Sequence, residues 1–259
     1  GKVFQEKKIA LFVVTYNAEK HIEKTLSRIP EWCRPLLAEI YVIDDFSKDN
    51  TYDVALATGK KLGIKNFSVM RTPSNQGYGG NQKIGYTYAI QKNYDIVILL
   101  HGDGQYPPEY IPNIVAGYAD HKIDAVFGSR MMTRYDALRG GMPLYKWLGN
   151  QALTFIENSI LGTKLSEFHS GYRSYRTSAL KKIPFHLNSN DFHFDTDISI
   201  QLSLGGNRIF AIPMPTHYGD EECHVNGTKY AWNCFKSALK SRMHQAGIFF
   251  QPNFEMPEN

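Results

Sequence analysis

The chain has 259 residues, of which 42% are hydrophobic, and this is enough to bury the core of a single domain. Its net charge of +4 comes from scattered basic residues, which argues against nucleic-acid binding but suits anionic substrates or an anionic membrane surface. Three cysteines without a CxxC spacing, no leader-like start and no apolar run of ~20 residues predict a cytoplasmic protein without disulfides or membrane spans.

Two buried strands are predicted near the N-terminus, and both end in polar residues. The first covers residues 9–17, and the helical spacing of residues 18–28 follows it. The second covers residues 38–45 and ends in two aspartates, followed by a turn and a helix over about 52–62. The two aspartates could cap the turn and helix or contact a ligand at the strand end.

A glycine-rich loop and a third buried strand come next. A short strand over 67–71 leads into the loop Asn-Gln-Gly-Tyr-Gly-Gly-Asn at 75–81, and a helix then leads into the strand at 96–100. Directly after this strand in the sequence, His101, Asp103 and Gln105 alternate with glycines, which allow close approach of the backbone to a ligand. Oxygen ligands at the carboxyl end of a strand suit Mg²⁺ or Mn²⁺ that holds phosphates. The alternative is a glycine-rich turn with a capping aspartate.

In the second half of the chain, basic and acidic residues also lie at the end of a predicted strand and at the start of a predicted helix. A strand over 125–127 leads into Gly-Ser-Arg, and an amphipathic helix begins near residue 145. Asp195 and Asp197 lie at the start of a helix over 196–204. A last helix begins near 228, with aromatic residues on one face and cations nearby; this face suits packing on the protein or a membrane interface.

Strands that alternate with helices predict an α/β fold with a mostly parallel central sheet and helices on both faces. The order of VTYN, DD-S-DNT, NQGYGGN and GDGQYPPE resembles the GT-A glycosyltransferases of family 2, above all the dolichyl- and polyprenyl-phosphate sugar synthases. The resemblance covers roughly residues 9–218. We expect one domain over 1–259, with a nucleotide-binding half at about 8–105, an acceptor and sugar half at about 106–227, and a C-terminal helix and tail at 228–259.

The resemblance implies a donor site for a UDP- or GDP-sugar. The residues expected to contact the donor are Thr15, Tyr16, Asn17, Asp45, Gly77, Tyr78, Gly79 and Asp103. The divalent cation, Mn²⁺ or Mg²⁺, is expected on Asp103 and Gln105. His101 stands where the family often has an aspartate, and it could ligate the cation, contact the donor phosphates or donate a hydrogen bond to the sugar.

The resemblance also implies an acceptor site. Phosphate of the donor or acceptor is expected to contact Arg130, Arg139 and Arg173. His169 is expected at the acceptor and sugar site, and the alternative is a histidine that only stabilises the fold. In many inverting relatives a carboxylate near Asp195 or Asp197 is the general base, and we favour Asp197. A phosphate acceptor needs no base, so there the aspartates would orient the sugar or stabilise the helix N-terminus. The segment 217–227 is unlike the basic acceptor loop of the lipid-phosphate synthases.

The predicted function is inverting transfer of a sugar from a nucleoside diphosphate sugar to a polyprenyl phosphate at the cytoplasmic membrane face, with Arg130 and the cation offsetting leaving-group charge. One alternative is transfer to a saccharide hydroxyl in surface polysaccharide synthesis. Another is a non-catalytic nucleotide-sugar binding protein, because His101 replaces an acidic residue of the family.

Overall fold

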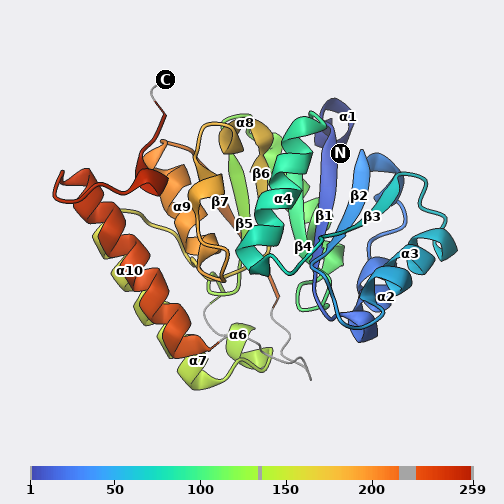
Figure 1. The fold of residues 1–259 in the computed structure, drawn as a ribbon, viewed down its shortest axis with the longest axis horizontal. Helices are drawn as coiled ribbons and strands as arrows, with labels where there is room; N and C mark the ends of the chain where they lie inside the picture. Colours follow the sequence, from blue (N-terminus) through green and yellow to red (C-terminus); the bar gives the residue numbers. More distant parts are fainter. Residues whose placement is uncertain (1, 134–135, 216–225, 258–259) are drawn as a thin grey trace.

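The computed structural model describes residues 2–133, 136–215 and 226–257, and its centre is a seven-stranded sheet (Figure 1). The strands lie in the order β3-β2-β1-β4-β6-β5-β7. Their bounds are β1 Ile9–Thr15, β2 Glu39–Asp44, β3 Phe67–Arg71, β4 Ile96–His101, β5 Ala125–Ser129, β6 Arg173–Arg176 and β7 Ile209–Pro213. Every pairing is parallel except those of β6, which runs antiparallel to β4 and β5. The predicted mostly parallel α/β sheet is confirmed.

The sheet register brings the ends of the strands together. Thr15 of β1 pairs with Asp44 of β2, and the neighbouring Val14 pairs with His101 of β4. All seven residues of β1 are buried, because helices cover the sheet on both faces, as in other parallel sheets. Since β6 is antiparallel, the segment that precedes Arg173 lies at the same edge as these strand ends. Polar residues from both halves of the chain therefore converge at one edge.

Helices cover both faces of the sheet. One core lies under α4 (Gly77–Gln91), α8 (Thr177–Leu180) and α9 (Phe194–Leu204). The opposite core is covered by helices from the first half of the chain. These are α1 (Lys2–Glu6), α2 (Glu19–Ser27), α3 (Thr51–Lys61) and α5 (Ile111–Ala116), together with the 3-10 turns Arg34–Leu36, Pro108–Tyr110 and Gly117–Ala119.

Two long helices lie at one side of this sandwich. α7 (Leu144–Leu161) follows the short α6 (Asp136–Arg139) and packs against α10 (Gly227–Gln245), as Figure 1 shows at the lower left. The turns Phe185–Leu187 and Pro252–Phe254 pack against each other and against α9. Among the described helices, none is both long and apolar enough to cross a bilayer. Most of the segment 217–227, which differs from the acceptor loop of the lipid-phosphate synthases, lies outside the described residues.

Candidate active site

The loop after β4 places two oxygen-bearing side chains on one tight turn. The backbone N–H of Gln105 donates to Asp103 Oδ1 at 2.9 Å, and Gly104 between them has φ +79°. Gly102 lies so close to β1 that a Cβ there would meet Thr15 Oγ1 at 2.8 Å. Asp103 and Gln105 are only half-buried. The turn therefore offers a carboxylate and a carboxamide to the edge of the sheet, and this donor set fits Mg²⁺ or Mn²⁺.

His101 belongs to a chain of polar contacts that links both halves of the protein. Tyr78 Oη lies 3.1 Å from His101 Nε2 and donates to Asp195 Oδ2 at 2.8 Å. The hydroxyl has a single proton, so this bond to Asp195 makes His101 Nε2 the donor in the first contact. Burial lowers the pKa of His101, which favours the neutral ring. His101 thus presents Nε2–H toward Tyr78, with Tyr106 packed against its ring edge-on at 4.8 Å.

Asp195 and Asp197 leave the first turn of α9 in different directions. Asp195 faces α4, where Gln82 Nε2 donates to its Oδ1 at 3.2 Å, in addition to the bond from Tyr78. Asp197 Oδ2 instead accepts from the backbone N–H of Ser189 at 3.1 Å. Burial raises the pKa of Asp197. The structure therefore joins Asp195, and not the favoured Asp197, to the network of His101.

The residues expected to contact the donor from β1 and β2 lie at neighbouring strand ends, which are joined by hydrogen bonds from backbone N–H groups. Tyr16 is 42% exposed, and Asn17 has φ +48° with its backbone N–H donating to Ser47 Oγ at 2.8 Å. Asp45 is buried, and its Oδ1 accepts from the backbone N–H of Gln76 at 2.8 Å. Burial raises the pKa of Asp45, whereas these hydrogen bonds oppose the shift. Asp45 thus fastens the loop before α4 to the end of β2.

The glycines of that loop, which are expected to contact the donor, have a packing role in the structure. A Cβ on Gly77 would meet the backbone oxygen of Asn190 at 2.6 Å, and one on Gly79 would meet that of Ser189 at 2.3 Å. The Gly79 N–H already donates to Asn190 O at 2.8 Å. The glycines let the N-terminus of α4 approach residues 189–190, and their contact with the donor stays a prediction.

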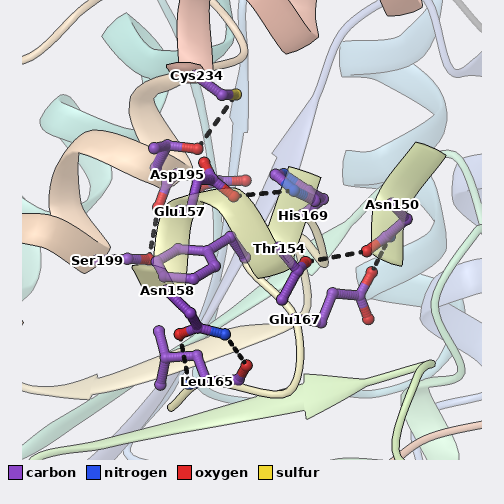
Figure 2. A network of polar contacts seen from close by, with 12 residues as sticks. Asn150, Thr154, Glu157, Asn158, Leu165, Glu167, His169, Asp195, Ser199 and Cys234 are labelled. Atoms are coloured by element: carbon purple, nitrogen blue, oxygen red, sulfur yellow. Dashed lines mark hydrogen bonds and ion pairs between the residues drawn. The ribbon is translucent and has the colours of Figure 1, made fainter. Parts of the chain in front are cut away.

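Arg130 is held at the end of β5 by a buried carboxylate. Its Nε donates to Glu167 Oε1 at 2.9 Å, its backbone N–H donates to Glu167 Oε2 at 2.8 Å, and the side chains form an ion pair. Asn150 of α7 donates to the same carboxylate at 2.8 Å (Figure 2). Burial opposes ionisation of Glu167, but the Arg130 charge and the hydrogen bonds prevail and lower its pKa. Arg130 therefore lies, preorganised, at the same edge as His101.

The other predicted phosphate ligands lie in different surroundings. Arg173 is completely buried and donates to the backbone oxygens of Ser170, Asp195 and Phe168 and to Ser199 Oγ. These bonds give Arg173 a structural role, and its position does not support phosphate contact. Arg139 is exposed at the end of α6. His169 contacts Tyr230 Oη through Nδ1 at 3.1 Å rather than any residue of the His101 network.

Several residues of the site were not predicted from the sequence. Tyr106 carries no sequence signal beyond its place in the loop, yet its hydroxyl accepts from the Gly171 N–H at 2.8 Å. Gly171 is required there, because a Cβ would meet His101 Nε2 at 2.6 Å. Gln82 and Glu167 become site residues only through tertiary contacts. A polar stripe on α7 that includes Asn150, Thr154 and Glu157 at spacings of four and three is a sequence signal that could have located Asn150, the partner of Glu167.

Comparison with known proteins gives a consistent family. Residues 10–184 match the model of glycosyl transferase family 2. The chain is 25% identical over 217 residues to the undecaprenyl-phosphate mannosyltransferase of Micrococcus luteus, covering 80% of this chain and 82% of that protein. It is 27% identical over 229 residues to the UDP-N-acetylglucosamine–dolichyl-phosphate N-acetylglucosaminyltransferase of Methanococcus voltae, with coverage of 82% and 87%.

Solved structures with the same fold include sugar transferases to small acceptors. Glucosyl-3-phosphoglycerate synthase of Mycobacterium tuberculosis superposes with a TM-score of 0.68 at 18% identity, covering 96% of this chain and 84% of that chain. Mannosyl-3-phosphoglycerate synthase of Rubrobacter xylanophilus gives a TM-score of 0.68 at 16% identity, with coverage of 97% and 79%. The first enzyme has also been solved with Mn²⁺, UDP and phosphoglyceric acid. The fold is thus of the GT-A type, and by its family match the chain belongs to the family 2 glycosyltransferases.

Proposed function

We propose that this glycosyltransferase moves a sugar from a nucleoside diphosphate sugar to a polyprenyl phosphate at a membrane surface. The observation that carries the choice of acceptor is that α7 buries polar side chains and exposes apolar ones. In this helix, all of whose residues are described, the two buried residues are Thr154 and Glu157, whereas Leu144, Leu148 and Phe155 are 59%, 53% and 73% exposed. A helix with its polar face inward presents its apolar face to another phase.

The neighbouring helix α10 also exposes apolar side chains. Trp232 of α10 is 58% exposed and stacks on Phe235, and Lys236 lies over the Trp232 ring. Ile248 and the two phenylalanines that follow α10 are exposed as well. Aromatic side chains with flanking cations suit an interface of anionic lipid headgroups. Two relatives named for undecaprenyl or dolichyl phosphate transfer, at 25% and 27% identity, agree with a lipid acceptor.

The donor end is proposed to hold the diphosphate beside the turn of Asp103. A divalent cation bound by Asp103 and Gln105 would offset the charge that grows on the departing diphosphate. The structural relative solved with Mn²⁺ and UDP supports this donor chemistry. Arg130 adds positive charge from the end of β5, and the Tyr16 ring is exposed where a base could stack.

The acceptor phosphate is already an anion, so its oxygen can attack the anomeric carbon without a general base. Asp195 accepts hydrogen bonds from Tyr78 and Gln82 and is nearly inaccessible to solvent. We propose that it positions Tyr78 and His101 against the sugar and the phosphates. The diphosphate leaves as the new bond forms, and this displacement inverts the anomeric configuration.

The test is a donor and acceptor screen on the purified protein, which measures the nucleoside diphosphate released. UDP- and GDP-sugars are offered with Mn²⁺, Mg²⁺ or EDTA, and with or without a short polyprenyl phosphate in detergent. Release that requires both cation and lipid phosphate supports the proposal. Cation-dependent release that ignores the lipid and responds to a saccharide would replace the acceptor. Tight nucleotide-sugar binding without release under any condition would favour a non-catalytic binding protein.

Asp103→Asn should abolish this release, because a carboxamide removes the negative charge that a cation needs. Asp120→Asn is the matched control, since Asp120 is exposed in the turn before β5, at the opposite edge of the sheet. Equal activity of the two variants would contradict the placement of the cation.

A further inference from the structure

A carboxylate, an imidazole and a thiol lie close together where α7, α10 and the segment before β6 meet. Glu157 of α7, His169 of the segment before β6, and Cys234 of α10 each offer one ligand atom, and these atoms lie within 4.8 Å of one another. Figure 2 shows Glu157 pointing toward His169, with Cys234 nearby. His169 Nε2 and Glu157 Oε2 are 3.1 Å apart. Three separate segments of the chain thus direct metal-ligating atoms to one point.

The buried Glu157 carboxylate has the His169 ring as its ion-pair neighbour but accepts no hydrogen bond from the described residues. Its side chain is 0% exposed. His169 Nε2 has no hydrogen-bond partner there either, so the contact between the two lacks hydrogen-bond geometry. Buried charges in proteins are usually paired or bound to metal. The ligand atoms of Glu157 and His169, together with that of Cys234, lie close enough together to bind a common ion.

We propose that Glu157, His169 and Cys234 bind one zinc-class divalent cation, in a site separate from that of Asp103. A thiolate and an imidazole select borderline-soft ions such as Zn²⁺ over Mg²⁺ or Mn²⁺. One thiolate and one carboxylate would neutralise the two charges of the ion, which removes the cost of burying Glu157. Bonds of roughly 2.0–2.3 Å set tetrahedral ligand atoms about 3.5 Å apart, so binding draws the three side chains inward.

The surroundings of the cluster match those of a protein metal site. Tyr230 Oη lies 3.1 Å from His169 Nδ1, where it can accept the proton that a ligating histidine keeps on its other nitrogen. Thr196 Oγ1 donates to Cys234 Sγ at 3.2 Å, as outer groups do to ligating thiolates. Three ligands leave a fourth position open.

The ion would hold the acceptor half of the active site in place. His169 is two residues from Gly171, which touches His101, and two residues from Glu167, which holds Arg130. Binding would tie α7 and α10 to this segment. The inference does not depend on the identity of the donor or acceptor, because its tests measure metal content, spectra and stability.

The first test measures zinc in protein purified without chelator, followed by Co²⁺ titration of the metal-free protein. We expect close to one equivalent of zinc, and with Co²⁺ a thiolate charge-transfer band and tetrahedral visible bands that saturate at one equivalent. Zn²⁺ should raise the melting temperature, whereas Mg²⁺ should not. Protein that contains no zinc and gives no cobalt–thiolate band would overturn the proposal.

Variants assign the band to its ligands. Cys234→Ser should abolish the thiolate band and Glu157→Gln should weaken Co²⁺ binding by tenfold or more. Cys33→Ser and Cys223→Ser should keep the band, and so should Asp103→Asn, since no sulfur belongs to the donor-side site. A band that survives in Cys234→Ser would overturn the assignment even if all variants fold. Circular dichroism of each metal-free variant checks that the fold is kept.

Discussion

The ion pair between Arg130 and Glu167 should contribute far more to stability than an ion pair on the surface. The Glu167 side chain is 0% exposed and that of Arg130 is 10% exposed. Removal of one partner of a buried pair costs roughly 3–5 kcal/mol, because the other charge stays buried without compensation. Glu167→Ala also removes the acceptor of Asn150 Nδ2 and of the Arg130 backbone N–H. Because Arg130 retains some solvent contact, we expect a loss of about 3 kcal/mol, at the lower end of this range.

Thermal and urea denaturation of purified variants would measure this loss. A chain of this size loses roughly 2–4 °C per kcal/mol, so Glu167→Ala should lower the melting temperature by about 6–12 °C. Glu109→Ala is the matched control, since Glu109 also pairs with an arginine, Arg28, but at the surface, where such pairs contribute about 0–1 kcal/mol. If the two variants lost the same stability, the argument from burial would be refuted.

Three further predictions concern the contact of Gly171 with His101, the pKa of Glu167 and the exposed face of α7. Gly171→Ala should lower kcat about 10- to 100-fold in the assay of nucleoside diphosphate release, because its Cβ would stand 2.6 Å from His101 Nε2. Gly149→Ala, with open space around it, should leave kcat unchanged. A normal rate in Gly171→Ala would refute the close contact. The stability advantage of the wild type over Glu167→Gln should be full at neutral pH and shrink as acid titrates Glu167 through its folded pKa, which lies below the ordinary value of about 4.5. A difference that stayed constant to about pH 3 in urea denaturation would argue against the ion pair. Phe155→Ser removes a ring that is 73% exposed. It should weaken the affinity for anionic vesicles about tenfold, measured by co-sedimentation, without lowering the melting temperature. Unchanged vesicle binding would count against a membrane-facing α7.

The fold and the strand-end residues could be predicted because they depend on local sequence. Apolar runs mark the buried strands, and parallel strands end at one edge, so the sequence alone places His101, Asp103 and Asp45 at that edge. The match to family 2 confirms the resemblance that the ordered motifs indicated. The individual contacts of the donor, cation and acceptor with these residues stay predictions.

Other residues could not be predicted, because their roles depend on tertiary packing. Nothing in the sequence distinguishes Asp195 from Asp197, whose carboxylates bind different partners, Tyr78 and the backbone of Ser189. Arg173 looks like any basic residue in a motif, but β6 carries it into the interior. Gly79 resembles a phosphate-binding glycine, although its local requirement comes from Ser189, more than one hundred residues away.

The most direct test of the account uses a donor sugar that carries a stable isotope and follows it into the acceptor by mass spectrometry. With a divalent cation and a short polyprenyl phosphate, we predict that the lipid gains the mass of one labelled sugar for each nucleoside diphosphate released, and that EDTA or Asp103→Asn prevents this gain. Release of nucleoside diphosphate with the label only in free sugar or in a saccharide would contradict the proposed acceptor.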